Sequence, residues 1–154
     1  MKVYLAASFS SRHRIRPIRD RLWEMGHDVV STWLDEAIPP PGMSKSTFDR
    51  KLGLKDLAES ASADLVIVDL LEPSTTGGRY VELGLAIGRF QRQSVWLVGP
   101  LEGVFHYLAD ASFATWDECL MALRPEPLIH ITPIDDVAVL MADPSWLERE
   151  GPND

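Results

Sequence analysis

The chain has 154 residues, of which 45% are hydrophobic and 25% charged, the balance of an ordinary globular domain. Its formal net charge of −8 argues against a nucleic-acid polymer as partner, because proteins that bind such polymers usually present a positive surface. The single cysteine, Cys119, excludes an internal disulfide, and the apolar runs are too short for a signal peptide or a membrane span, so we expect a cytoplasmic protein.

Short apolar runs predict the strands of a sheet. Because they are apolar on both faces, they indicate strands covered on both sides, as in a parallel sheet. The candidate strands are residues 2–7, 28–33, 64–70 and 94–99. Amphipathic segments between them predict three helices, from near Arg14 to Gly26, over about 45–62 and over about 78–91. The first is expected to start near Arg14 because a helix tolerates Pro17 only in its first turn.

This alternation predicts an α/β fold, a single-domain doubly wound parallel sheet of the flavodoxin or Rossmann type with flanking helices. Residues 34–46 contain three prolines and form a long irregular insertion, a candidate lid. Beyond Pro100 the pattern weakens. The weaker candidates are helices at 104–109, 115–123 and 133–141, an edge strand at 128–131 and a frayed tail at 147–154.

In such sheets, ligands bind where the loops gather at the carboxyl ends of the strands. This rule nominates three stretches, ASFSSRH (7–13), LEPSTTGGRYVE (71–82) and GPLEGVFH (99–106). Asp69 lies at the same predicted edge. The three stretches come from separate parts of the chain, and their convergence predicts one ligand site.

Glu82 is a carboxylate in an apolar helical run that follows Gly77 and Gly78. The glycines permit unusual backbone angles and the close approach of a ligand. We expect Glu82 in the first turn of its helix, where the macrodipole keeps a carboxylate ionised near neutral pH. Such a group is a nucleophile, a stabiliser of an oxocarbenium ion, or merely a complement to the helix dipole. Asp56, judged from its position alone, is a solvated side chain.

The loop after the first strand combines hydroxyl and basic side chains beside a helix start, which suits a phosphate. Its donors are Ser8, Ser10, Ser11, Arg12, His13 and Arg14. The alternative is a solvated basic face, above all for Arg19 and Arg21. His106 is a lone histidine on a predicted helix, and such histidines are more often packed than functional.

Three stretches taken in order resemble the nucleoside 2-deoxyribosyltransferase family, which includes transferases that act on deoxynucleosides and relatives that hydrolyse nucleoside monophosphates. They are KVYLAASFSSR (2–12), KDLAESASADLVIVDL (55–70) and TTGGRYVELGLA (75–86), and the resemblance covers roughly residues 2–110. It implies that Glu82 is the nucleophile that attacks the anomeric carbon of the sugar. It implies further that Asp56 helps to protonate the departing base and that Tyr4 hydrogen-bonds near the nucleophile.

The resemblance also assigns the substrate contacts. Ser8 matches a serine that contacts a 5′-phosphate, with Arg12 as a neighbouring candidate, while Phe9 packs against the base or the pocket wall, or else is a core aromatic. Thr76 departs from the aspartate of the transferases and stands where the nucleotide relatives carry a serine, which favours a phosphorylated substrate. His106 lies in the loop where the family places a late substrate contact. The remaining predicted contacts are Gly77 and Gly78.

The function implied is cleavage of the N-glycosidic bond of a (deoxy)nucleoside or its 5′-monophosphate, by hydrolysis or transfer, without a cofactor. The partner is the small-molecule substrate, and the family implies a homo-oligomer in which a neighbour's loop completes the pocket. No metal is expected, because the four histidines are scattered and the cysteine is single. One alternative is a non-catalytic nucleotide-binding or sensing module on the same fold. A phosphoribohydrolase ranks third, because TTGGRYVE lacks the second glycine-threonine step of the "PGGxGTxxE" pattern.

Overall fold

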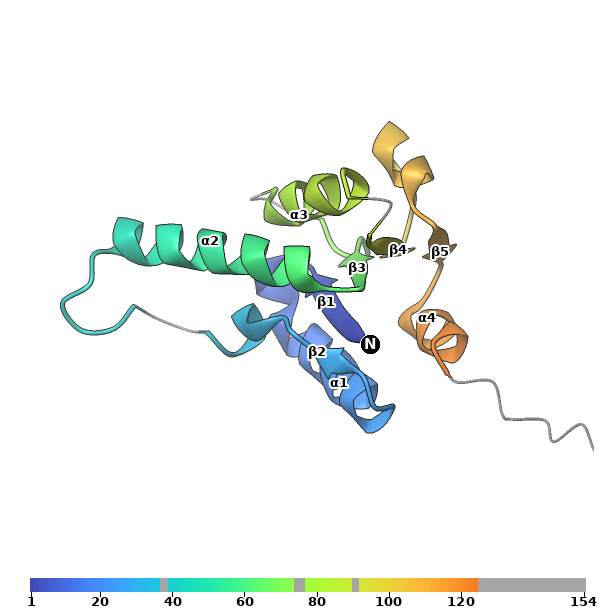
Figure 1. The fold of residues 1–154 in the computed structure, drawn as a ribbon, viewed down its shortest axis with the longest axis horizontal. Helices are drawn as coiled ribbons and strands as arrows, with labels where there is room; N and C mark the ends of the chain where they lie inside the picture. The colour runs from blue at the N-terminus through green and yellow to red at the C-terminus, as the bar shows by residue number, and fades with distance from the viewer. Residues whose placement is uncertain (37–38, 74–76, 90–91, 125–154) are drawn as a thin grey trace, which may run out of the picture. The chain divides into compact units, whose positions relative to one another are not determined.

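The computed structural model describes residues 1–36, 39–73, 77–89 and 92–124. A five-stranded sheet lies at its centre, in the order β2-β1-β3-β4-β5, and every neighbouring pair is parallel (Figure 1). The strands are β1 (Lys2–Ala6), β2 (Asp28–Val29), β3 (Leu65–Asp69), β4 (Ser94–Val98) and β5 (Ala111–Phe113). This order is the flavodoxin-like doubly wound arrangement, so the predicted fold class is confirmed.

The strand predictions hold where the chain is buried on both faces and fail at the edges. Every residue of β3 is buried, and so is every residue of β1 after Lys2. The candidate strand at 28–33 is only β2, because the chain turns after Val30 into the 3-10 helix η2 (Thr32–Asp35). Strand β5 was not predicted, since its three partly exposed residues carry no apolar run.

The helices are α1 (Arg12–Glu24), α2 (Lys45–Ser62), α3 (Gly78–Ile87) and α4 (Trp116–Ala122), with two further 3-10 helices, η1 (Phe9–Ser11) and η3 (Val104–Leu108). The predicted start of α1 was wrong. Because η1 runs directly into α1, the helix begins at Arg12 and Pro17 is its sixth residue. Proline then removes one hydrogen bond, to the carbonyl of His13, and His13 is exposed to water. The predicted helix over 78–91 ends earlier, at Ile87.

Figure 1 shows α2 and α3 on one side of the sheet and α1 and α4 on the other. Helix α1 packs onto the sheet through the stripe of Ile15, Ile18 and Leu22. Helices α2 and α3 contact each other. Their contact brings together the two carboxylates that the sequence singled out, Asp56 and Glu82.

Two sets of predictions lie partly or wholly outside the described residues. The candidate lid at 34–46 includes residues 37–38, which are not described, and its role stays a prediction. The elements predicted at 128–131 and 133–141 and the tail at 147–154 are not described either. Within the described part of the chain, no helix combines the length and apolar character that a membrane crossing requires.

Candidate active site

A pocket of about 400 Å³ lies between α2 and α3, and both singled-out carboxylates line it. From α2 it is lined by Arg50, Gly53, Leu54, Asp56 and Leu57, and from α3 by Gly78, Val81 and Glu82. The charged groups of this lining are thus two acids and one arginine, in otherwise apolar walls. In such surroundings charged groups are poorly hydrated, which alters their protonation.

Tyr4 connects the sheet to this pocket. It lies on β1, is fully buried, and its hydroxyl donates a hydrogen bond of 2.6 Å to Oε1 of Glu82. Burial raises the pKa of Tyr4 above its usual range, and the negative charge of Glu82 raises it further. Tyr4 therefore keeps its proton and acts as a permanent donor that orients one carboxylate oxygen. The family resemblance implied that Tyr4 hydrogen-bonds near Glu82, and the two side chains are in contact.

Glu82 is the fifth residue of α3 and so lies in the second turn, not in the first turn as predicted. The helix begins at Gly78, as predicted, and its N-cap is Gly77, with a left-handed φ of 71° that favours glycine. Burial raises the pKa of Glu82 to about 7, against the lowering effect of the Tyr4 hydrogen bond, and the charge of Asp56 raises it further. Burial thus opposes the expected effect of the helix dipole, and with a pKa of about 7 Glu82 is only partly ionised near neutral pH.

Asp56 is a partly buried residue of α2, and its Oδ1 is buried without a hydrogen-bond partner among the described residues. Burial raises its pKa to about 6, which the positive charge of Lys55 opposes and the negative charge of Glu59 reinforces. Asp56 is thus not the solvated side chain that its position alone suggested. A buried acceptor without a donor is costly, and such atoms are common where a protein has a chemical task.

Together the two acids form a coupled pair. With pKa values raised to about 6 and about 7, Asp56 and Glu82 hold roughly one proton between them near neutral pH. The Tyr4 hydrogen bond favours the ionised form of Glu82, but the pKa of Glu82 is still the higher of the two, so in the free protein the shared proton lies mainly on Glu82. One ionised and one protonated carboxyl group are what a nucleophile and a general acid require. Within the described residues, no group of three or more His, Cys, Asp and Glu side chains is placed to hold a metal ion.

The loop after β1 lies outside the lining of this pocket. Ser8 is buried and its hydroxyl is 2.9 Å from that of Ser10, while Arg12 donates a 2.8 Å hydrogen bond to the carbonyl of Glu36. Phe9 is 50% exposed, with the Arg12 guanidinium 4.7 Å from its ring centre, so the core alternative for Phe9 was wrong. The substrate contacts predicted for this loop stay predictions. Thr76 lies outside the described residues.

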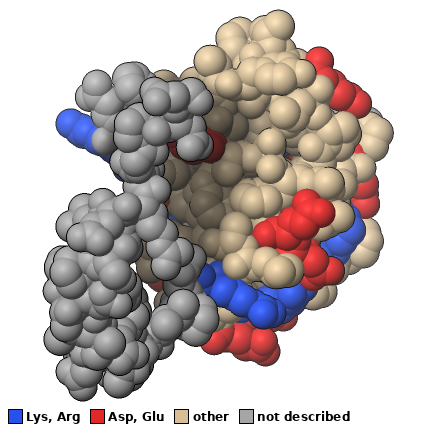
Figure 2. All heavy atoms as spheres, turned by 90° about the vertical axis from the view of Figure 1, so that its right-hand side faces the viewer, with Lys and Arg blue, Asp and Glu red and all other residues tan. Residues whose placement is uncertain are grey.

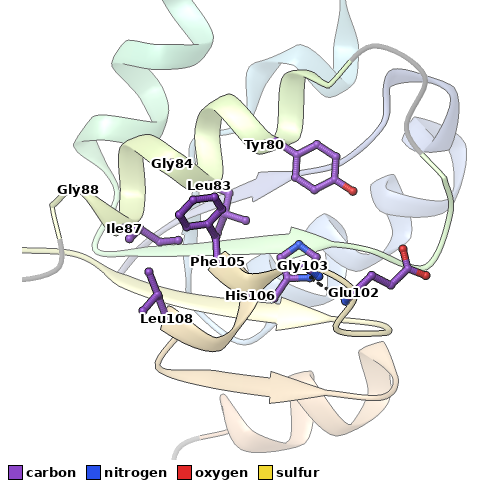
Figure 3. Close-up of a pocket in the computed structure, with 10 residues that line it drawn as sticks. All are labelled: Tyr80, Leu83, Gly84, Ile87, Gly88, Glu102, Gly103, Phe105, His106 and Leu108. Carbon is purple, nitrogen blue, oxygen red and sulfur yellow. Dashed lines mark hydrogen bonds between the residues drawn. The ribbon is translucent and has the colours of Figure 1, made fainter.

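His106 lines a different pocket, of about 710 Å³, between α3 and η3 (Figure 3). Its Nδ1 accepts hydrogen bonds from the backbone N–H groups of Glu102 and Gly103, and its ring stacks on Tyr80 at 6.1 Å between centroids. Figure 3 shows side chains of α3, among them Leu83, facing those of η3 across a largely apolar space. This pocket is the larger of the two, but it holds no acid pair. We place the candidate active site at the smaller pocket, because Asp56 and Glu82 both line it.

Several pocket residues were missed from the sequence. Gly53 precedes Asp56 by three positions, and residues three apart share a helix face, so this spacing was the available signal. Leu54 and Val81 are each 60% exposed and form the apolar rim of the pocket. Nothing in the sequence distinguishes such a rim from ordinary surface leucine and valine. Arg50 carried no signal either, since it resembles any exposed helix arginine.

No protein-family model matches this sequence, and no curated protein matches it. Solved structures do match. A 2-deoxyribosyltransferase from the psychrotolerant bacterium Bacillus psychrosaccharolyticus superposes with a TM-score of 0.64 and 20% identity, over 82% of this chain and 98% of that chain. The chain therefore has the fold of a 2-deoxyribosyltransferase.

Two further structures share this 2-deoxyribosyltransferase fold. A CMP N-glycosidase from Clostridium botulinum matches with a TM-score of 0.50 and 20% identity, over 80% of this chain and 98% of that chain. A conserved protein from Enterococcus faecalis matches with a TM-score of 0.57 and 14% identity, over 79% of this chain and 95% of that chain. The resemblance predicted from the sequence motifs is thereby confirmed at the level of the fold.

Proposed function

We propose that this protein cleaves the N-glycosidic bond of a (deoxy)nucleoside or its 5′-monophosphate, by hydrolysis or by transfer of the (deoxy)ribosyl group. The observation that carries the proposal is that one pocket holds both Glu82, whose Oε1 accepts a hydrogen bond from Tyr4, and Oδ1 of Asp56, which is buried without a hydrogen-bond partner among the described residues. The fold supports it, since one structure of this fold is a 2-deoxyribosyltransferase and another a CMP N-glycosidase.

The reaction begins with Glu82. Tyr4 holds its Oε1, which leaves Oε2 to attack the anomeric carbon of the sugar. As this C–O bond forms, the bond from the anomeric carbon to the base nitrogen breaks and its electron pair goes to the base. In the reactive form of the pair the shared proton is on Asp56, which gives it to the departing base and so makes the base a better leaving group.

The second half reverses these roles. A water molecule or an acceptor base attacks the anomeric carbon, the bond to Glu82 breaks, and Asp56, now ionised, takes up the proton that the acceptor releases. Water gives a hydrolase and a second base gives a transferase. The same two carboxyl groups serve both outcomes, so the choice depends on how well the pocket excludes water.

Substrate contacts complete the proposal. Gly78 lines the pocket and has no side chain, so the sugar can approach the backbone at the start of α3. We keep Ser8, Arg12 and Thr76 as the candidates for a 5′-phosphate, on the family resemblance. His106 lies in the pocket on the other side of α3, so we give it no step in the reaction.

We also propose a homo-oligomer, supported by an uncharged surface at η3. Four large apolar side chains of this short helix are 60–78% exposed, namely Val104, Phe105, Tyr107 and Leu108. Figure 2, which looks onto the side that carries η3 and β5, shows a broad uncharged area with charged side chains along its borders. Exposed apolar surface of this kind is typical of protein interfaces. Two copies of a negatively charged chain repel each other least where neither surface carries charged side chains. Sedimentation equilibrium of wild type and Phe105→Asp tests this, and a monomeric wild type would refute it.

The test of function is a substrate panel. Wild type, Glu82→Ala and the exposed control Glu24→Ala are incubated with ribo- and deoxyribonucleosides and their 5′-monophosphates, with and without an acceptor base. We expect wild type and the control to release free base and Glu82→Ala to release none. Near-wild-type turnover by Glu82→Ala would exclude it as the nucleophile. Binding of one compound without turnover by wild type would favour the non-catalytic sensing module.

A further inference from the structure

Asp69 is a fully buried carboxylate at the end of β3 that the proposed reaction does not use. Arg14 of α1 donates two hydrogen bonds to it, of 3.2 and 2.5 Å, and the indole N–H of Trp116 donates a third, of 3.1 Å. Burial removes the charge of Asp69 from water completely and that of Arg14, whose side chain is 28% exposed, in part, and an apolar pair of the same volume is often at least as stable. Stability alone therefore does not explain why the pair is there.

The same arginine holds a second carboxylate. Its Nε donates to Glu72 Oε1 at 3.2 Å, and the hydroxyl of Ser11 donates to Glu72 Oε2 at 2.5 Å. The Ser11 hydrogen bond and Arg14 lower the pKa of Glu72, and the hydrogen bond to Asp69 raises that of Arg14, so these charges persist at neutral pH. The loop that follows β3 is thus fastened to the turn that follows β1.

Arg79 closes the arrangement from the other end of this loop. It is the second residue of α3 and only 4% exposed. Its Nη1 donates to the backbone carbonyls of Asp69, at 2.8 Å, and Glu72, at 2.6 Å. Both ends of the turn from Asp69 to Glu72 are thereby tied to the first turn of α3. Glu82 follows Arg79 by three residues on the same helix.

We propose that Arg14, Asp69, Glu72 and Arg79 form a positioning network that sets the start of α3 relative to β1. The Tyr4–Glu82 hydrogen bond joins these same two elements, and at 2.6 Å it leaves little room for displacement. None of the four residues lines the candidate active site. They act on the reaction through Glu82 and are positioning residues. A misplacement of about 1 Å in a reacting group costs on the order of 100-fold in rate.

The test compares Asp69→Asn and Glu72→Ala with a matched control, Asp117→Asn, which loses an exposed bond to another arginine of α1, Arg21. On the panel's best substrate, we expect kcat to fall on the order of 10- to 100-fold in the two network variants, with KM changed by less than about threefold. The control keeps the wild-type kcat. If Asp69→Asn does not fold, Glu72→Ala carries the test, since the Glu72 side chain is 40% exposed.

A conservative variant separates positioning from simple charge balance. Arg14→Lys keeps the positive charge beside Asp69 but lacks the fork that reaches two carboxylates. A positioning role predicts that kcat stays low in Arg14→Lys even where its melting temperature is close to that of wild type. Recovery of wild-type kcat by lysine would overturn the proposal.

The kcat measurements rest on the proposed function, so a second experiment measures the network without any substrate. We expect faster hydrogen exchange at the backbone amides of Tyr80, Val81 and Glu82 in Asp69→Asn and Glu72→Ala than in wild type and Asp117→Asn. Unchanged exchange in both network variants would overturn the proposal. If wild type turns over nothing while exchange changes as expected, the proposed function fails and the network stands.

Discussion

Replacement of Glu82 by glutamine tests the electrostatics of the site without any substrate. Burial raises the pKa of Glu82 from 4.5 to about 7. The folded state therefore holds this proton more tightly than the unfolded state, so the contribution of Glu82 to stability is complete below pH 4.5 and is lost as the pH rises through 7. At 1.36 kcal/mol per pH unit, the difference between 4.5 and about 7 amounts to about 3 kcal/mol of unfolding free energy. Glutamine is neutral at every pH and escapes this loss, while its side-chain oxygen still accepts the Tyr4 hydrogen bond.

The assay is urea denaturation of wild type and Glu82→Gln at pH 4.5 and pH 8. We expect the two proteins to have similar unfolding free energies at pH 4.5 and the variant to be more stable by about 3 kcal/mol at pH 8. That difference corresponds to a melting temperature higher by roughly 6–12 °C for a chain of this size. Glu24→Gln, at the exposed end of α1, serves as the control for loss of one charge. A stability difference that is the same at both pH values, or a variant less stable than wild type at pH 8, would refute the reasoning.

Four further predictions concern turnover and folding. The pH profile of kcat is expected to be bell-shaped with its maximum between about pH 6 and pH 7, because below this window Asp56 and Glu82 are both protonated and above it both are ionised. A profile that is flat from pH 5 to 9 would contradict the acid pair. Tyr4→Phe removes the hydrogen bond that lowers the pKa of Glu82, the higher of the two values, so the basic limb of this profile is expected to move to higher pH and kcat to fall on the order of 10- to 100-fold, measured by base release. Asp56→Asn is expected to lose more activity on poor leaving groups than on a p-nitrophenyl 2-deoxyriboside, and an equal loss on both would exclude Asp56 as the acid. Gly77→Ala forces a side chain onto a φ of 71° and is expected to cost about 1–2 kcal/mol in urea denaturation, so an unchanged midpoint would speak against the left-handed N-cap.

The parts of the fold that follow from local pattern were predicted well. Strands β1 and β3 are buried on both faces, and this shows in the sequence as continuous apolar runs. Helix α2 was predicted with its bounds, because a serine N-cap and an amphipathic stretch mark it locally. Strand β5 was missed because an edge strand of three partly exposed residues leaves no such pattern.

Some properties of the candidate site depend on contacts between distant segments and could not be predicted from local sequence patterns. The pKa of Asp56 is raised by burial in the folded chain, where α2 contacts α3, a segment more than 20 residues away in the sequence. Spacing along one helix cannot reveal it. The turn in which Glu82 lies was misjudged although the start of α3 was predicted, because a helix that begins at Gly78 has Glu82 as its fifth residue.

The rim of the pocket sets the competition between the two possible products. Leu54 and Val81 expose most of their surface at its mouth, so in the isolated chain the proposed glycosyl–Glu82 intermediate would face bulk water. Water is then the acceptor in excess, and an acceptor base must outcompete it during the lifetime of that intermediate. Whatever covers Leu54 and Val81, a substrate base or a second copy of the chain, lengthens that lifetime. The ratio of transferred to hydrolysed sugar thus measures how completely two surface side chains are covered.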